Sequence, residues 1–319
     1  MNFPVFDLHC DTALALLGDS LQEAGSLLKN SGHIDLERAK GLGGYAQCFA
    51  CFTTPSEKLP DGMTVETLFE REMISVLREV EKNRDLISLA YSASEVEDNR
   101  KNGKMSAILT IEGPAGFGFD PALLEDLYKI GFRITTLGWN EKNPLCGSHK
   151  TGGGLTDLGR EYVFEAQRLG MLIDVSHISD EAFWDIMDIT QSSVVATHSN
   201  SRAIHPVSRN LTDEMFMAIC QTGGVAGLNL YADFLGQQPT LDTACEHILH
   251  WMELGGAKHI ALGGDLDGCD VLPADFAGVQ DYPKLADSLL ARGLTEQEVM
   301  DIFWNNALGV IENAVCNHP

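Results

Sequence analysis

Short apolar stretches alternate along this chain with longer segments in which apolar residues recur at helical spacing. Eight of the short stretches are predicted as strands. They are residues 5–9, 45–52, 106–111, 133–137, 172–176, 193–197, 224–230 and 259–262. Several, such as 172–175 and 194–196, are apolar at nearly every position, which is typical of strands covered on both faces. The pattern therefore favours a parallel sheet.

The segments between these strands carry helix signals. Residues 156–169 hold an apolar stripe at helical spacing, and Gly170 follows as a stop. Asp120 and Pro121 begin another helix, with the aspartate at the cap and the proline in the first turn. Thr295 begins the last helix in the same manner. Eight strand-then-helix units in one chain predict an α/β fold of the (β/α)8 or TIM-barrel class.

A doubly wound sheet is the alternative fold, and it should carry a glycine-rich phosphate turn after its first strand. Here the first strand ends in His9-Cys10-Asp11 instead. No internal repeat or linker is visible, so residues 1–319 are predicted to form a single barrel domain. The segments 12–44 and 53–105 exceed a minimal barrel connection, and we expect them to carry extra helices over the rim.

Charge narrows the choice of partners. The chain has 46 acidic and 22 basic residues, a net charge of −24, so it repels nucleic acid and anionic lipid over most of its surface. The first residues show no basic start followed by an apolar stretch, and no apolar run is long enough for a membrane span. We expect no signal peptide, no membrane partner and no nucleic-acid partner.

The eight cysteines are scattered and too sparse for a disulfide scaffold. Cys48 and Cys51 form a lone C-x-x-C within the apolar run 45–52, and it is predicted to be buried strand rather than a zinc or redox site. Reduced thiols of this kind fit a cytoplasmic protein.

Candidate chemistry begins at the end of the first predicted strand. His9 and Asp11 lie two residues apart and therefore point together at the carboxyl end, where barrels of this class place their active sites. Taken alone, such a pair is more often a surface pair. Glu112 closes the third strand, and a carboxylate there needs a partner unless it faces solvent.

Other strands end in the same way. The fifth and sixth strands lead into His177 and His198, and the eighth is followed by Asp265 between glycines. One such histidine is usually a core residue, but five strands that bring His or carboxylate to one rim predict a metal site. Imidazole and carboxylate suit zinc best, and manganese or iron less well. Five ligands fit two ions that share a bridging carboxylate. The predicted ligands are His9, Asp11, Glu112, His177 and His198.

Six motifs follow one another along the chain. They are His9-x-Asp11, Glu112-Gly113, Asp174-x-Ser176-His177, Thr197-His198-Ser199, Ser208-Arg209-Asn210 and Gly264-Asp265-x-Asp267-Gly268. In combination they resemble the membrane dipeptidase (renal dipeptidase) family of the amidohydrolase superfamily, over residues 5 to about 310. The resemblance implies a barrel of the metal-dependent hydrolase type, two zinc ions, a homodimer, and hydrolysis of dipeptides, often with a D-residue at the C-terminal side.

The resemblance also assigns the ligands to the two ions. His9 and Asp11 would bind one zinc ion, and His177 and His198 would bind the other. Glu112 would bridge the two ions and so count among the catalytic residues.

Four residues are expected to contact substrate. Asp265 would take a proton as general base and return it to the leaving amine as acid. Arg209 would clamp the terminal carboxylate of a dipeptide. Trp139 stands where animal members of the family have a substrate-contacting His, so its indole, a neighbour such as Asn140 or His149, or zinc alone would hold the developing oxyanion. We expect the third alternative, in which zinc alone holds the oxyanion and Trp139 acts chiefly as an apolar wall.

Two alternative functions remain open at this point. One is another binuclear hydrolase reaction on a lactone, phosphoester or deaminase substrate, and the other is a barrel that binds metal without turnover. The other histidines carry weaker signals. His247 and His250 are predicted on one amphipathic helix face, and His205 in a rim loop. No partner can be named for His33, His259 or His318.

Overall fold

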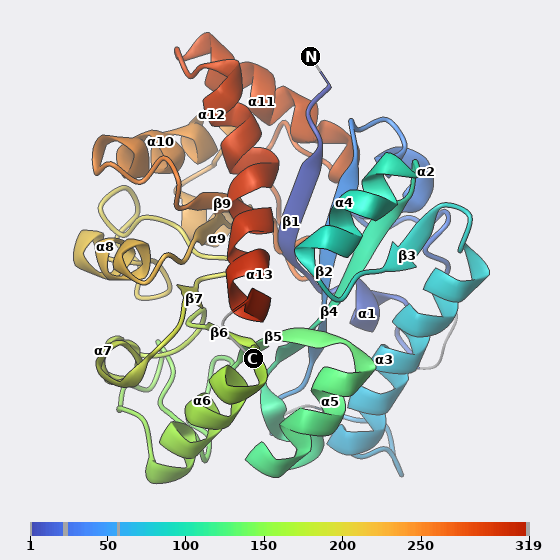
Figure 1. The fold of residues 1–319 in the computed structure, drawn as a ribbon, viewed down its shortest axis with the longest axis vertical. Coiled ribbons are helices and arrows are strands. Elements are labelled where there is room, and N and C mark those ends of the chain that lie inside the picture. Colours follow the sequence, from blue (N-terminus) through green and yellow to red (C-terminus); the bar gives the residue numbers. More distant parts are fainter. Residues whose placement is uncertain (1, 22–24, 56–57, 317–319) are drawn as a thin grey trace.

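The computed structural model describes residues 2–21, 25–55 and 58–316, with only the backbone of residues 315 and 316. His318 therefore lies outside the described residues. In Figure 1 a ring of strands is surrounded by helices, and the helix nearest the C-terminus crosses the centre of the ring. Among the described residues, no helix is both long and apolar enough to cross a membrane.

Eight parallel strands form the barrel, in the order β7-β6-β5-β4-β2-β1-β9-β8. Their bounds are β1 Val5–Cys10, β2 Tyr45–Phe52, β4 Met105–Glu112, β5 Phe132–Thr136, β6 Leu172–Asp174, β7 Val194–Val195, β8 Ala226–Leu228 and β9 Ile260–Leu262. The two ends of this order meet where Ala196 pairs with Ala226. Ala196 donates to the Val225 carbonyl at 3.0 Å and accepts from the Gly227 N–H at 2.8 Å. The predicted TIM barrel is confirmed.

All eight predicted strands are present, but the structure corrects two details. The last four strands are shorter than predicted: β6, β7 and β8 end early, after residues 174, 195 and 228, and β9 begins one residue later than predicted. A ninth strand, β3 Ile87–Leu89, pairs in parallel with β4 and lies outside the barrel order. Its three residues, of which Ile87 is buried and the other two are half-buried, are too few to give a periodic signal that the sequence could reveal.

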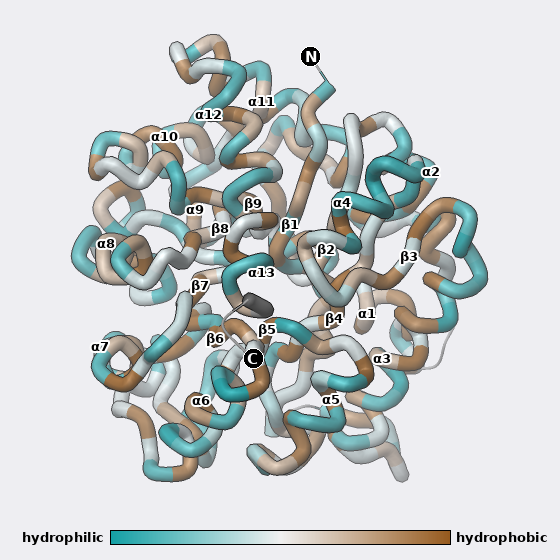
Figure 2. Tube along the Cα trace, viewed as in Figure 1, coloured by the Kyte–Doolittle hydropathy of each residue, from teal (hydrophilic) through white to brown (hydrophobic). Residues whose placement is uncertain are grey.

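The helices wrap the outside of the barrel. Their bounds are α1 Thr12–Ala15, α2 Leu36–Ala39, α3 Val65–Lys82, α4 Ala93–Lys101, α5 Leu124–Ile130, α6 Asp157–Leu169, α7 Asp180–Ile189, α8 Asp213–Gln221, α9 Ala232–Leu235, α10 Leu241–Glu253, α11 Tyr282–Ala291, α12 Glu296–Met300 and α13 Asn306–Cys316. Figure 2 shows hydrophobic colour concentrated on the strands and on the inner faces of these helices. The segment 12–44 contains α1 and α2. The segment 53–105 contains α3, β3 and α4.

The predicted helix ends agree with the structure. Thr156 caps α6 by accepting the Gly159 N–H, and Gly170 ends this helix in the left-handed conformation. Asp120 accepts the Ala122 N–H at the 3-10 turn that leads into α5. Thr295 forms a reciprocal capping box with Glu298 at the start of α12. Local hydrogen-bond chemistry therefore sets these boundaries.

Side chains of the strands fill the barrel lumen, and α13 closes its amino end. Phe6 and Leu8 of β1 share one buried cluster with Ala307 and Val310 of α13 and with Trp304, which lies in the π-helical turn just before α13. The rings of Phe6 and Trp304 lie 5.7 Å apart. Because the amino end is packed in this way, the carboxyl end of the barrel is available for a site.

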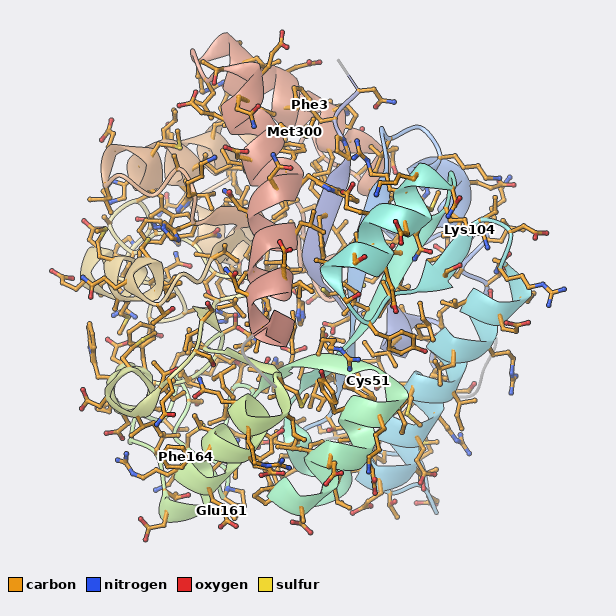
Figure 3. All side chains as sticks on the ribbon, viewed as in Figure 1. Phe3, Cys51, Lys104, Glu161, Phe164 and Met300 are labelled. Atoms are coloured by element: carbon orange, nitrogen blue, oxygen red, sulfur yellow. The ribbon has the colours of Figure 1, made fainter. Side chains whose placement is uncertain are left out.

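Cys48 and Cys51 are both completely buried in β2, as predicted. Because they are three residues apart on a strand, they face opposite sides of the sheet. Cys48 packs in the lumen and Cys51 packs beneath the outer helices. Figure 3 shows Cys51 deep within the molecule. The pair cannot chelate one ion together.

Candidate metal centre and substrate pocket

The predicted site residues meet at the carboxyl ends of the strands. His9 lies in β1, Asp11 directly follows it, and Glu112 is the last residue of β4. His177, His198 and Asp265 each lie three residues beyond the end of a strand. These strands are β6, β7 and β9, in that order. All of these side chains are buried except that of Asp11, which is half-buried.

Two of these residues adopt a left-handed backbone conformation. The φ angles of His177 and Asp265 are 70° and 56°, in a region that non-glycine residues rarely occupy. Such a conformation costs about 1–3 kcal/mol and persists only where the surroundings hold it. It turns both side chains out of the direction of the preceding strands, β6 and β9.

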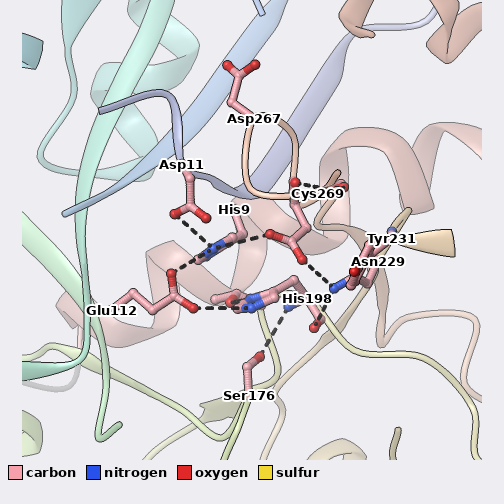
Figure 4. A network of polar contacts seen from close by, with 12 residues as sticks. His9, Asp11, Glu112, Ser176, His198, Asn229, Tyr231, Asp267 and Cys269 are labelled. Atoms are coloured by element: carbon pink, nitrogen blue, oxygen red, sulfur yellow. Dashed lines mark hydrogen bonds and ion pairs between the residues drawn. The ribbon is translucent and has the colours of Figure 1, made fainter. Parts of the chain in front are cut away.

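Glu112 lies at the middle of the cluster, with each carboxylate oxygen facing a different side. Its Oε2 lies 3.3 Å from His9 Nε2, and Asp11 Oδ1 lies 3.7 Å from the same nitrogen. Its Oε1 lies 2.9 Å from His177 Nε2 and 3.6 Å from His198 Nε2. Figure 4 shows Glu112 between His9 and His198. A bridging carboxylate has this arrangement.

Several metal-binding atoms of the cluster are buried and have no hydrogen-bond partner in the described part of the chain. They are His9 Nε2, Asp11 Oδ1 and Glu112 Oε2. His9, Glu112 and His198 place one ligand atom each within 4.8 Å of one another, and so do His9, Asp11 and Asp265. Leaving such atoms unpaired in a buried site is costly. The residues present therefore fit metal ions, which would satisfy these atoms together.

Burial and mutual charge shift the pKa values of the cluster. Burial raises the pKa of Glu112, but the charges of His9 and His177 outweigh it and lower the value. Burial lowers the pKa of His9, but Glu112 outweighs it and raises the value to about 10. Burial, with the charge of Arg209, lowers the pKa of His177 to about 3. Burial raises the pKa of Asp265 to about 6. The cluster thus favours the charged forms of Glu112 and His9 and the neutral form of His177.

A relay of hydrogen bonds orients His198. Thr197 Oγ1 donates to Asp174 Oδ2 at 2.6 Å, because the carboxylate can only accept. The hydroxyl oxygen of Thr197 then accepts from His198 Nδ1 at 2.7 Å. The Nε2 of His198 is left with its lone pair directed at Glu112. Outer hydrogen bonds of this kind commonly fix the tautomer of a metal-binding histidine.

Arg209 is buried, with 4% of its surface exposed. Its Nη1 donates to Ser199 Oγ at 2.7 Å, its Nη2 donates to the His198 carbonyl at 2.9 Å, and its Nε has no partner. It forms no ion pair with any carboxylate of residues 2–21, 25–55 and 58–316. The Phe234 ring lies 5.5 Å from its guanidinium carbon. A buried guanidinium of this kind is suited to bind an anion.

Three neighbours, Asn229, Thr12 and His33, support the loop that carries Asp265. Asn229 Nδ2 donates to Asp265 Oδ2 at 3.0 Å. Asp267, two residues further on, accepts from Thr12 Oγ1 at 2.7 Å and from the His33 N–H at 2.5 Å. The Asp267 N–H in turn donates to His33 Nδ1 at 2.9 Å. His33 therefore has the partner that the sequence could not name, and it ties the first rim segment to the site.

A pocket of about 230 Å³ opens onto this cluster. The cluster side of its wall includes Asp11, Glu112, His177 and Asp265, and its outer wall includes Phe52, Trp139, Asn140, Tyr231 and Phe234. The Trp139 ring meets Phe52 edge-on at 5.1 Å. Larger hollows of 660 and 520 Å³ lie on the helical surface. Figure 3 shows Glu161 and Phe164, which line the first of these, on the outer side of α6.

The remaining predicted histidines lie elsewhere. His247 is buried in α10, where it accepts the Ser201 N–H and donates to the Leu235 carbonyl. His250 contacts Asp213 at 2.8 Å. The two are therefore helix residues with separate partners, as predicted, and do not form a ligand pair. His205 is half-buried in its loop, and His259 contacts the Gly224 carbonyl.

Sequence reasoning missed the site's supporting residues. Asn229 and Thr197 act through hydrogen bonds, and Tyr231 and Phe234 form part of the pocket wall. Asn229, Tyr231 and Phe234 all follow β8, a strand for which no site residue was predicted. Their position after a barrel strand was the signal that could have found them.

Comparison with known proteins agrees with the geometry of the site. Residues 1–318 match the family model described as membrane dipeptidase, peptidase family M19. An uncharacterised dipeptidase of Schizosaccharomyces pombe is 31% identical, over 96% of this chain and 79% of that protein. A metallo peptidase of Rhodobacter sphaeroides, liganded with a phosphinate mimic of the dipeptide L-Ala-D-Ala, has a TM-score of 0.87 at 27% identity and covers 98% of this chain and 100% of its own. The M19 dipeptidase AC has a TM-score of 0.87 at 28% identity, over 98% and 99% of the two chains.

The fold and the cluster of His, Asp and Glu residues define a metal-dependent hydrolase on a TIM barrel. More narrowly, this chain belongs to the membrane dipeptidase family, peptidase family M19, and is a metallopeptidase of the dipeptidase type.

Proposed function

We propose that this chain is a zinc-dependent dipeptidase that hydrolyses the amide bond of dipeptides, including those with a C-terminal D-residue. One observation carries the proposal: the two oxygens of Glu112 each face a separate group of ligand atoms. The dipeptide mimic bound by the Rhodobacter sphaeroides relative supports the substrate class.

Two ions would share the cluster. His9 and Asp11 would hold one beside Glu112 Oε2, and His177 and His198 would hold the other beside Oε1. Neutral imidazole together with carboxylate is a ligand set that suits zinc. When bound, the ions would acidify water and polarise the scissile carbonyl.

The chain's own residues would do the rest. Asp265, held by Asn229, accepts the proton of the attacking water and returns it to the leaving amine nitrogen. Arg209 binds the terminal carboxylate of the dipeptide. Because Arg209 is bonded to the carbonyl of His198, the clamp lies at a fixed distance from the centre, which favours dipeptides over longer peptides. Trp139 and Phe52 wall the pocket.

The test is a substrate panel with zinc-loaded protein. Dipeptides such as L-Ala-D-Ala and L-Ala-L-Ala are expected to be hydrolysed, whereas lactones and phosphoesters are not. Turnover of a lactone or phosphoester without turnover of any dipeptide would establish the other hydrolase reaction. No turnover of any substrate by protein that holds zinc would establish a barrel that binds metal without catalysis.

The homodimer and the cytoplasmic location remain predictions. Light scattering on the purified protein measures the first, and a value near the mass of one chain would contradict it. Fractionation of cells that express the chain measures the second.

A further inference from the structure

The carboxamide of Asn140 is held between two imidazole rings. Its Oδ1 lies 3.1 Å from His177 Nδ1 and 2.8 Å from His149 Nε2. The other ring nitrogen of His149 lies 3.0 Å from Ser208 Oγ. The backbone N–H of His149 also donates to the His177 carbonyl at 2.8 Å. His149 is thus fixed at both its ring and its backbone.

The role of His177 determines where the protons lie in this chain of contacts. His177 Nε2 faces Glu112 Oε1, and a nitrogen that binds a cation must present a lone pair. The proton of the neutral ring is therefore on Nδ1, which donates to Asn140 Oδ1. This step rests on the proposed function, because it requires His177 to be a metal ligand.

The same oxygen has a second lone pair. An amide oxygen only accepts, so His149 Nε2 must carry a proton and donate to it. In the matching neutral tautomer, His149 Nδ1 accepts a hydrogen bond from the hydroxyl of Ser208. Each partner in the sequence His177, Asn140, His149 and Ser208 then has one compatible role.

The consequence for Asn140 is a fixed orientation. With both neighbours donating to Oδ1, the N–H2 group must occupy the opposite side of the carboxamide. Asn140 is half-buried and lines the 230 Å³ pocket. Its Nδ2 makes no hydrogen bond to any residue of the described chain, residues 2–21, 25–55 and 58–316. The N–H2 group is therefore a free donor at the pocket wall.

We infer that His149 is a positioning residue that fixes the Asn140 carboxamide, and that Asn140 donates a hydrogen bond to the reacting carbonyl of the substrate. Asn140 lies one imidazole ring away from Glu112 and lines the same pocket, whereas Arg209 is the group proposed for the terminal carboxylate. A neutral donor aimed at a developing negative charge lowers the barrier without added cost of reorganisation.

Two substitutions of His149 separate positioning from bulk. The side-chain nitrogen of glutamine can occupy the place of Nε2, and that of asparagine the place of Nδ1. We expect His149→Gln to keep kcat near the parent value and His149→Asn to lower it roughly tenfold. We expect Asn140→Ala to lower kcat by about 10²-fold with little change in KM. Equal kcat for His149→Gln and His149→Asn, or a raised KM at unchanged kcat for Asn140→Ala, would overturn the inference.

A spectroscopic measurement tests the tautomer without any substrate. In zinc-loaded protein labelled with ¹⁵N-histidine, the long-range ¹H–¹⁵N spectrum should show His149 protonated at Nε2, with His149→Gln identifying its signals. A ring protonated only at Nδ1 would contradict the assignment. Metal content and Tm of the variants should match the parent. If the parent protein hydrolyses no dipeptide, the proposed function is refuted. If the parent is active but His149→Gln and His149→Asn have the same kcat, only this inference is refuted.

Discussion

At the scale of single residues, the site depends on side chains whose charge or lone pair has no partner among the described residues. Arg209 is the clearest example outside the metal cluster, because its Nε is buried and no described residue accepts its hydrogen bond. Burial lowers the pKa of Arg209, and the charges of Asp265, Asp174 and Glu112 oppose this shift only from a distance. A substrate carboxylate would give this guanidinium the partner that it lacks.

Arg209→Met should therefore reduce kcat/KM for dipeptides by roughly 2–4 kcal/mol, the range for a truncated buried charge pair. Dipeptide amides, which lack the carboxylate, should be poor substrates of the parent. Arg168→Met is the matched control, because Arg168 forms an exposed ion pair with Glu165 on α6, and such pairs are worth about 0–1 kcal/mol. Equal turnover of dipeptides and their amides by the parent would rule the clamp out.

Trp139 tests a different kind of contact. Its ring packs on Phe52 and lines the pocket, which supports a role in shaping specificity more than rate. We expect Trp139→Phe to keep kcat within about tenfold and to shift the preference for substrate side chains, measured across a dipeptide panel. A thousandfold fall in kcat at unchanged preference would show instead that the indole N–H is a catalytic donor.

At the scale of elements, the rim segments are attached to the barrel helices by buried polar contacts. Glu79 of α3 accepts the Leu27 N–H at 2.7 Å and pairs with Lys82 at 2.7 Å. Burial raises the pKa of Glu79, but the hydrogen bonds from Lys82 and Leu27 outweigh it and lower the value. The first rim segment, which carries His33 next to the site, is held partly through this carboxylate.

Glu79→Gln should lower the free energy of unfolding by about 1–2 kcal/mol at pH 7, measured by urea unfolding. Because the pKa in the folded state is lowered, this stabilisation is complete above the unfolded value of about 4.3 and is lost as pH falls through the folded value. The difference between variant and parent should therefore shrink in acid. Glu81→Gln, on the exposed face of the same helix, should change stability very little. If Glu79→Gln lowered the free energy of unfolding by the same amount at pH 7 and in acid, this role for the carboxylate would be contradicted.

The sequence predicted elements well where local chemistry decides them. The cap at Thr156, the capping box at Thr295 and the apolar run of β2 are local signals, and the structure has all three. Prediction from the sequence failed where an element depends on distant partners. The strand β3 forms only because β4 lies beside it, and β7 ends after Val195 because the following residues turn toward the site.

At the scale of the whole molecule, the barrel explains which site residues could be predicted. Residues at strand ends converge by topology, so His9, Glu112 and His198 could be placed at one rim from spacing alone. Asn229 and the relay from Asp174 through Thr197 could not, because their partners come from other strands and loops. Their role depends on hydrogen-bond geometry that only the folded chain shows.

The arrangement around Glu112 makes the central claim measurable. Glu112→Gln removes the charge that faces both ligand pairs, so it should weaken both ions together, as measured by metal content after dialysis. Loss of only one ion from this variant would contradict the bridge. His250→Gln, which changes a histidine of α10 paired with Asp213, is the control and should keep the parent's metal content.

The most direct test is a zinc titration of metal-stripped protein, followed through hydrolysis of L-Ala-D-Ala. Activity should start near zero, rise with added zinc, and reach its plateau at about two equivalents per chain, because the five proposed ligands, with Glu112 as the bridge, serve two ions. A plateau at one equivalent would contradict the binuclear centre. Activity that is absent at every zinc concentration, in protein that has bound the metal, would contradict the dipeptidase itself.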